Sequence, residues 1–365
     1  MTESAPRVPG GARPGVLMIG NFLSGSVGVR CVCEDLAEGL RSRGWRVLAA
    51  SSAKSRVLRL LHMLATAWLK RARYGVAQID LYADLAFVYA EVMAASLSVL
   101  RCPYALTLHG GALADFALRS PGRLQRLLKS ADAVTAPSPY HQEGLRQFRS
   151  DIRVVRNGLD LSLYQARRLT AARPLLVWVR AFHETYNPLL AVEVIRLLSA
   201  ECPEMELLMV GPDKGDGTYG QTVGHVRAYG LSDRVRIVEA VPKTEVPLML
   251  REGDIFLNTT DVDNAPVTVV EAMACGLCVV STNVGGVPRL LCDGRDAILV
   301  PPRDAAAMAG AVRRIVGDPP LASLLSANAR IAAEAFDREA VLTVWEELLW
   351  EISGKDPAGS EPKPR

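Results

Sequence analysis

The chain of 365 residues has no long uninterrupted apolar run, although 49% of its residues are hydrophobic. A membrane-spanning helix needs about 18 or more such residues, so the sequence predicts no membrane-spanning helix. Aromatic residues are scarce, at 6%, and they are not interleaved with basic residues as in a nucleic-acid-binding module. We therefore expect a globular protein that does not bind nucleic acid, with a length that suits two domains.

Cysteine is scattered rather than arranged in a framework. The seven cysteines form an odd set, which is typical of a reducing compartment. The pairs Cys31/Cys33 and Cys275/Cys278 have no matching second pair and no nearby histidine, so we expect no bound metal. Residues 1–15 lack the apolar segment of a secretory signal and are predicted to form a loose leader. We expect a cytoplasmic protein.

Charge is distributed unevenly behind a net charge of +3. Residues 1–165 contain 21 Lys and Arg against 12 Asp and Glu, whereas the remainder contains 21 against 27. A basic first half indicates an anionic partner, such as lipid head groups or a phosphorylated acceptor.

The segment from Lys54 to Arg73 carries an apolar stripe at helical spacing between basic ends. The stripe consists of Val57, Leu60, Leu61, Leu64, Trp68 and Leu69. Two interpretations stay open. The helix lies on an anionic membrane surface, which makes the protein peripheral on the inner face of the cell membrane, or it packs its stripe against the core.

Both halves of the chain alternate short apolar strands with helices. The first half begins with a strand at residues 16–20, and the second restarts with a strand at 175–180. This order is typical of α/β domains with doubly wound parallel sheets, which bind ligands at the carboxyl ends of their strands. We place the domains at residues 16–168 and 169–337. A helix at 338–352 and a disordered tail at 353–365 follow.

The stretch from Ile255 to Pro288 reads as strand, helix and strand. Pro266 suits the first helical turn, which leaves the N–H groups of Val267 and Thr268 without partners in the helix. Such an end attracts phosphate. Glu271 lies about 7 Å further along the helix, where it reaches the ribose of a nucleotide diphosphate bound at the helix end.

Three other positions lie where strands end. Gly25 and Gly28 either let the first loop approach a ligand closely or form a flexible turn. His109 follows an apolar strand and precedes two glycines, so it faces the ligand crevice and is a candidate for contacting a sugar. Arg180 ends a strand, where it either pairs with two phosphate oxygens or is simply solvated.

Several segments resemble glycosyltransferase family 4, the retaining nucleotide-sugar glycosyltransferases. They are EAMACGLCVVSTNVGGVPRLL, DGRDAILVPP, ADAVTAPSPY, IRVVRNGLDLSLY, TLHG and LAEGLRSRGWRV. They span nearly the whole chain in the expected order. The resemblance implies the GT-B fold, in which two Rossmann-like domains face each other across a cleft and a C-terminal helix packs back toward the first domain.

The family motif consists of two glutamates separated by seven residues. Here Asp263 takes the first place and Glu271 the second. The resemblance implies that Glu271 holds the ribose hydroxyls and that Asp263 faces the donor sugar. It further implies that the backbone of Ala265, Pro266, Val267 and Thr268 meets the sugar and the diphosphate.

The resemblance also assigns roles to the strand-end positions. His109 matches the histidine near the transferred sugar, and Arg180 matches the phosphate-binding arginine. Gly28 matches the second glycine of the first loop. Gly25 and Gly211 join it in the set expected to bind the donor.

The sequence departs from the family at one expected cation. The family places a lysine about five residues after the arginine, whereas this chain has Thr185 there. Lys214 and Lys243 are candidates to replace the charge. The acid at Asp263 is also one methylene shorter than the family's glutamate.

The resemblance implies transfer of a hexosyl-type unit from a nucleotide-diphosphate sugar to an acceptor hydroxyl with retention, in polysaccharide, glycolipid or glycoconjugate synthesis. No metal or cofactor is expected beyond the donor. The acceptor is a carbohydrate, a lipid-linked or a phosphorylated molecule. Two alternatives stay open: a non-catalytic nucleotide-sugar-binding or partner protein, and a GT-B sugar-nucleotide epimerase.

Overall fold

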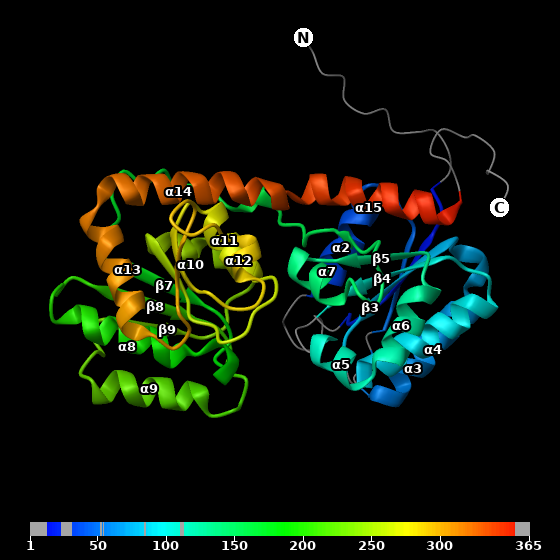
Figure 1. The fold of residues 1–365 in the computed structure, drawn as a ribbon, viewed down its shortest axis with the longest axis horizontal. Coiled ribbons are helices and arrows are strands. Elements are labelled where there is room, and N and C mark those ends of the chain that lie inside the picture. The colour runs from blue at the N-terminus through cyan, green and yellow to red at the C-terminus, as the bar shows by residue number, and fades with distance from the viewer. Residues whose placement is uncertain are drawn as a thin grey trace, which may run out of the picture. The chain divides into compact units, whose positions relative to one another are not determined.

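The computed structural model describes residues 13–22, 31–51, 53, 55–83, 85–109 and 113–354. The chain divides into unit 1, Met1–Gly158 with Arg338–Arg365, and unit 2, Leu159–Asp337. Each unit holds one six-stranded parallel sheet with helices packed beside it (Figure 1). The predicted α/β class with two parallel sheets is therefore confirmed.

The sheet of unit 1 has the strand order β2-β1-β3-β4-β5-β6. Its strands are β1 (Val16–Ile19), β2 (Val47–Ala50), β3 (Val76–Leu81), β4 (Tyr104–Leu108), β5 (Ala133–Ala136) and β6 (Arg153–Val154). The central strands are buried along their whole length. Parallel strands covered on both faces are apolar at nearly every position, which explains why these strands show little alternation.

Helices cover both faces of this sheet. They are α2 (Val32–Ser42), α3 (Arg56–Leu69), α4 (Leu85–Val99), α5 (Leu113–Arg119), α6 (Pro121–Ser130), α7 (Pro139–Leu145) and α15 (Arg338–Ser353), with a 3₁₀ turn at Arg71–Arg73. One core cluster joins the sheet to α2 and α15. The other joins it to α4 and α6.

The C-terminal helix α15 packs on unit 1 beside α2 (Figure 1), as predicted. Glu346 of α15 accepts hydrogen bonds from the indole N–H of Trp45 at 2.6 Å and from the guanidinium of Arg43 at 2.7 Å. A β-carbon at Gly39 of α2 would lie 2.7 Å from the side chain of Leu342. The two helices therefore approach closely at a glycine and are joined by a charged hydrogen-bond cluster.

The sheet of unit 2 has the strand order β12-β11-β10-β7-β8-β9. Its strands are β7 (Leu175–Val179), β8 (Glu206–Val210), β9 (Val235–Val238), β10 (Ile255–Asn258), β11 (Cys278–Thr282) and β12 (Ile298–Val300). Its helices are α8 (Pro188–Ser199), α9 (Thr218–Ala228), α10 (Val246–Glu252), α11 (Val267–Ala274), α12 (Val287–Leu290), α13 (Ala305–Gly317) and α14 (Pro319–Ala333). Three 3₁₀ turns lie at Leu161–Leu163, Glu184–Tyr186 and Glu334–Phe336. Helices α8 and α13 cover one face, and α10 and α11 cover the other.

The structure corrects the boundary that we expected near residue 168. The chain enters unit 2 at Leu159, whose N–H donates to the carbonyl of Phe336 at 2.7 Å. Tyr164 is buried in the unit 2 core, and Arg167 pairs with Asp254. Residues 159–168, which we placed in the first domain, are thus part of unit 2.

The chain termini extend beyond the described part. Residues 1–12 and 355–365, which hold most of the predicted leader and tail, lie outside the described residues. Within the described ranges, no helix is long and apolar enough to cross a membrane.

Replacing Glu346 with Ala should lower the free energy of unfolding by about 2 kcal/mol, because it leaves the Trp45 indole N–H without its acceptor and removes one of the two carboxylates that pair with Arg43. Urea unfolding followed by circular dichroism measures this loss. The matched control is Glu351→Ala, which breaks an exposed pair with Arg153 and should cost less than about 1 kcal/mol. Equal losses in the two variants would contradict the role of Glu346 in attaching α15.

Candidate functional site

The carboxyl edge of the unit 2 sheet gathers the predicted residues of the second half. Strands β10, β7 and β8 are neighbours in the sheet. Arg180 directly follows β7, Gly211 follows β8, and Asp263 lies in the loop after β10. Since parallel strands end at the same edge, these positions come together although they are far apart in the chain.

The Arg180 guanidinium is buried and paired. Its Nη2 donates to the carboxylate of Asp263, and its carbon Cζ lies 4.6 Å from the ring centroid of Tyr186. Burial lowers the pKa of Arg180, and the nearby Tyr186 and Glu271 oppose this shift. Its Nε is buried and has no hydrogen-bond partner among the described residues. A further anion or oxygen ligand beside this cation would therefore be favoured.

The Gly-Gly turn after β11 holds the loop that carries Asp263. A β-carbon at Gly285, whose φ is +52°, would overlap the carbonyl oxygen of Asp263. One at Gly286 would overlap the carbonyl oxygen of Asn264. The N–H of Gly286 donates to the Asp263 carbonyl at 2.8 Å. The two glycines are needed because the backbones of the two loops are in contact.

Gly211 makes a similar contact behind Arg180. A β-carbon there would overlap the carbonyl oxygen of Arg180, whose own N–H donates to Val210 at 3.0 Å. Gly211 thus allows the chain after β8 to pack against the chain after β7. Its contact with a donor stays a prediction.

The helix α11 begins at Val267, so the expected start at Pro266 is corrected by one residue. Pro266 has ψ of 102°, which is extended, and it is the residue directly before the first turn. The hydroxyl oxygen of Thr268 is buried without a hydrogen-bond partner in the described part of the chain. The helix end therefore combines unbonded N–H groups with an unsatisfied hydroxyl.

Glu271 lies inside unit 2, on α11. It is 4% exposed, and one carboxylate oxygen accepts a hydrogen bond of 2.8 Å from the hydroxyl of Tyr164. Tyr164 lies in the part of the chain that we placed in the first domain, so sequence reasoning missed this partner. A carboxylate held in this way is pre-oriented for further hydrogen bonds.

The loop that lacks the family lysine is fastened to the loop after β8. The N–H of Lys214 donates to the carbonyl of Phe182 at 3.2 Å, and the N–H of Glu184 donates to Asp216 at 2.8 Å. Thr185 uses its carbonyl to accept from Thr260. The exposed Lys214 is thus anchored beside the segment that lacks a lysine.

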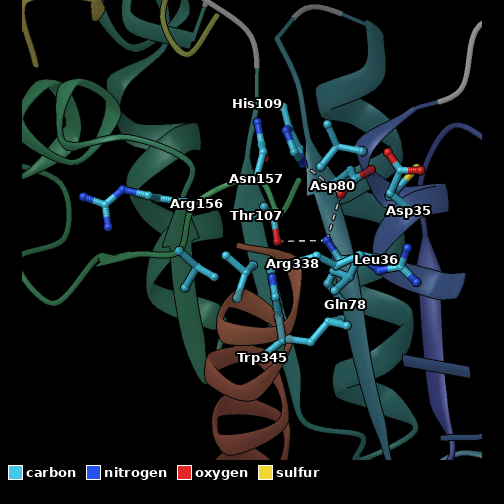
Figure 2. Close-up of a pocket in the computed structure, with 16 residues that line it drawn as sticks. Asp35, Leu36, Gln78, Asp80, Thr107, His109, Arg156, Asn157, Arg338 and Trp345 are labelled. Atoms are coloured by element: carbon cyan, nitrogen blue, oxygen red, sulfur yellow. Dashed lines mark hydrogen bonds and ion pairs between the residues drawn. The ribbon is translucent and has the colours of Figure 1, made fainter. Parts of the chain in front are cut away.

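The carboxyl edge of unit 1 holds His109 in a pocket of that unit (Figure 2). His109 Nε2 lies 3.0 Å from Asp80 Oδ1. Gln78 Nε2 donates to the same oxygen and to the hydroxyl of Thr107, both at 2.8 Å. Asp80 and Gln78 belong to β3, and sequence reasoning missed them. Two polar residues two positions apart in the strand VAQIDL were the available signal.

Two further contacts shape the His109 environment. The ring of Tyr82 stacks on it with centroids 5.1 Å apart and an interplanar angle of 19°. A β-carbon at Gly20, which follows β1, would overlap Asp80 Oδ2. Burial, and then the Asp80 carboxylate, raise the pKa of Cys33 and that of Tyr82. The Cys33 thiol and the Tyr82 hydroxyl are thus kept in their neutral forms.

Two predicted residues lie outside the described residues, namely Gly25 and Gly28. Within the described ranges, no group of three His, Cys, Asp or Glu residues is arranged to hold a metal ion.

Two parallel-sheet units with polar groups at their carboxyl edges define a two-domain α/β protein of the Rossmann-like kind. Residues 27–163 match the family model described as Glycosyltransferase Family 4, and residues 165–332 match the model described as Glycosyl transferases group 1. The chain belongs to the glycosyltransferases that join these two domains.

Two curated relatives are about a quarter identical to the chain over the aligned residues. The D-inositol 3-phosphate glycosyltransferase of Mycolicibacterium smegmatis is 26% identical over 80% of this chain and 66% of its own length. The putative colanic acid biosynthesis glycosyltransferase WcaL of Salmonella typhimurium is 26% identical over 67% of this chain and 63% of its own. The chain spans just under two thirds of these relatives.

Solved structures match nearly the whole chain. HepE of Anabaena, in complex with UDP and glucose, has a TM-score of 0.75 at 18% identity and covers 93% of this chain and 100% of its own. Sucrose-phosphate synthase of Thermosynechococcus elongatus has a TM-score of 0.74 at 20% identity, covering 93% and 99%. This likeness confirms the predicted GT-B fold. The cleft that the resemblance implies stays a prediction.

Proposed function

We propose that the protein transfers a sugar from a nucleotide-diphosphate donor to an acceptor hydroxyl with retention of anomeric configuration. The observation that carries this proposal is the carboxyl edge of unit 2. There the buried Arg180 and the first turn of α11 leave Nε and the Thr268 hydroxyl without partners among the described residues. Buried polar atoms are normally satisfied, and diphosphate and sugar oxygens supply what these atoms lack.

The donor would lie along α11. Its diphosphate would accept hydrogen bonds from Arg180 and from the N–H groups of Val267 and Thr268 at the positive end of the helix. Its ribose hydroxyls would donate to Glu271, which Tyr164 holds in place. The backbone between Ala265 and Thr268 would meet the sugar, as the family resemblance implies.

Charge governs the chemical step. The bond between the anomeric carbon and the diphosphate oxygen breaks, and negative charge grows on the leaving oxygens, where Arg180 stabilises it. The acceptor oxygen forms its bond to the anomeric carbon on the same face, and its proton passes to the departing phosphate. Neither a protein nucleophile nor a metal is required in this proposal.

In this proposal Asp263 has one role before the donor binds and another once the donor is bound. Without donor its carboxylate pairs with Arg180, which keeps a buried cation compensated and oriented. With donor we propose that sugar hydroxyls donate to Asp263 while the guanidinium turns its remaining N–H groups to the diphosphate. The acid that is one methylene shorter than glutamate suits this pairing.

Unit 1 would hold the acceptor, with His109 beside the transferred sugar. The basic first half supports a carbohydrate, lipid-linked or phosphorylated acceptor. Relatives named for D-inositol 3-phosphate and for colanic acid synthesis agree with such a range. We propose a role in polysaccharide, glycolipid or glycoconjugate synthesis.

A second function stays open because Thr185 replaces the family lysine. A protein that binds a nucleotide sugar without transferring it needs the ribose and diphosphate contacts but no extra stabilisation of the leaving group. Such a protein would bind donors as described above and would show neither transfer nor slow donor hydrolysis.

A panel of UDP- and GDP-sugars should raise the melting temperature with at least one donor, since a ligand that binds only the folded state stabilises it. Glu271→Gln should weaken binding of that donor about 10- to 100-fold, because it removes a charged hydrogen-bond acceptor. The control Glu193→Gln alters a partly exposed carboxylate of α8 that pairs with Arg196 of the same helix, α8. This control should leave the rise in melting temperature unchanged.

No shift with any donor would contradict the proposed function. A shift without transfer or hydrolysis, across carbohydrate, lipid-linked and phosphorylated acceptors, would favour the non-catalytic protein.

Lys214→Ala should weaken binding of the nucleoside diphosphate of that donor by about tenfold at low salt. The reason is that it removes a cation beside the segment that lacks the family lysine. Calorimetric titration measures the affinity, and the difference should shrink as salt is raised. Lys243→Ala, on the loop after β9, is the matched control. Equal effects of the two substitutions would show that only the net charge matters and would contradict a specific role for Lys214.

The exposure of α3 helps to decide between the two interpretations of its apolar stripe, namely contact with a membrane surface and packing against the core. Val57, Leu61 and Leu69 are 69%, 55% and 85% exposed, so much of the stripe faces solvent. The described side chains that α3 buries are Met63, Thr66 and Ala67. The core-packing interpretation thus accounts for only part of the helix.

Helix α4 extends this apolar surface. It packs beside α3, and the indole N–H of Trp68 donates to the hydroxyl of Ser96 at 2.7 Å. The two helices together expose large apolar side chains at Val57, Leu58, Leu61, Trp68, Leu69, Leu85, Val88 and Val99. A contiguous apolar patch of large side chains often marks an interaction site.

Charge indicates what covers the surface. Lys70, Arg73 and Arg101 are exposed near the carboxyl ends of the two helices, and residues 54–79 contain six Lys and Arg and no Asp or Glu. We propose that α3 and α4 bind an anionic membrane surface on its cytoplasmic side, with apolar side chains in the interface and cations at the head groups.

The double variant Leu58→Glu/Leu61→Glu should lose flotation with vesicles that contain anionic lipid, because two charges enter the apolar contact. The control Leu248→Glu/Leu324→Glu adds the same charge at side chains of unit 2 that are 57% and 50% exposed. This control should float like the wild type. Failure of the wild type to float, or equal loss in both variants, would overturn membrane binding by this surface.

A further inference from the structure

The ring of His109 is held from two directions. Its Nε2 lies 3.0 Å from Asp80 Oδ1, and its face stacks on Tyr82 (Figure 2 shows the contact with Asp80). The side chain is 11% exposed, and within the described part of the chain Nδ1 has no partner. The free position of the ring is therefore Nδ1.

The hydrogen bonds around Asp80 decide which nitrogen carries the proton. Gln78 Nε2 donates to Asp80 Oδ1 at 2.8 Å, so this oxygen is already an acceptor. Gln78 in turn is oriented by the hydroxyl of Thr107, which also bonds Thr135 at 3.1 Å. Because Oδ1 accepts, His109 must donate to it from Nε2–H.

We infer that Asp80 is a positioning residue that fixes the tautomer of His109, so that Nδ1 accepts a hydrogen bond from a substrate hydroxyl. In a neutral imidazole with the proton on Nε2, Nδ1 carries the lone pair. A hydroxyl donates to it, whereas a phosphate or carbonyl oxygen finds no donor there. This deepens the proposed function and rests on it: the group opposite His109 is a sugar or acceptor hydroxyl.

A purely structural role accounts poorly for an acid at this position. The Asp80 side chain is 3% exposed, and burying a carboxylate costs free energy that an apolar residue would not cost. Its neighbours make room for it, since a β-carbon at Gly20 would overlap Oδ2. Gly20 thus leaves space for the Asp80 carboxylate, and Gln78 donates a hydrogen bond to it. The side chain that the carboxylate orients is His109.

Nitrogen-15 NMR of the full chain tests the tautomer without any donor or activity. The His109 resonances are assigned by their loss in His109→Gln. At neutral to slightly basic pH, we expect the wild type to show a single Nε2-protonated ring. Asp80→Asn should keep this tautomer because Gln78 still requires an oxygen acceptor at the same place, whereas Asp80→Ala should populate both tautomers.

Kinetics give the second readout. Asp80→Ala should lower kcat about 10- to 100-fold, as the loss of an orienting hydrogen bond does elsewhere, with the donor KM changed less than about twofold. Asp80→Asn should restore most of kcat. Thr135→Val, which alters the same network behind Thr107, should leave the tautomer unchanged.

The outcomes separate the inference from the proposed function. An Nδ1-protonated or mixed ring in the wild type would overturn the inference whatever the activity. An unchanged tautomer in Asp80→Ala would overturn it as well. Absence of transfer with a fixed Nε2-protonated ring would contradict the catalytic function and leave the positioning role of Asp80 supported.

Discussion

A guanidinium buried at the end of a parallel strand needs a counter-charge, and in unit 2 Asp263 supplies it to Arg180. The surrounding backbone positions this pair. Gly211 lets the chain after β8 pack behind Arg180, and the turn at Gly285 and Gly286 holds the loop of Asp263. A cation kept inside the protein interacts with phosphate more strongly than one in water, because the local dielectric is lower.

Unit 1 uses the same edge of its sheet for a different chemistry. Its acid, Asp80, faces His109 instead of an arginine, and amide and hydroxyl groups of β3, β4 and β5 support it. In our proposal unit 1 thus offers a hydrogen-bond acceptor, Nδ1 of His109, whereas unit 2 offers a cation, the Arg180 guanidinium. We propose that the edge of unit 2 binds a diphosphate and that the edge of unit 1 binds a hydroxyl.

Much of the fold was predictable, because alternation, glycine and proline are local signals. Arg180 and His109 could be singled out because each follows a strand, and Glu271 because of its position along the predicted helix; their contacts with a donor stay predictions. Pairings across the sheet were not predictable: Arg180 meets Asp263 only through the neighbouring strands β7 and β10. Asp80 was hidden, together with Gln78, in a strand that is buried along its whole length and otherwise apolar. The stripe of α3 has the same spacing whether it faces core or lipid, so only burial separates the two.

The central claim is that the buried Arg180 and the end of α11 hold a diphosphate. A crystal structure with the nucleotide sugar that stabilises the protein most tests it directly. We predict diphosphate oxygens at the Arg180 guanidinium and at the N–H groups of Val267 and Thr268, with ribose hydroxyls on Glu271. A nucleotide bound elsewhere, with Arg180 touching only Asp263, would contradict it.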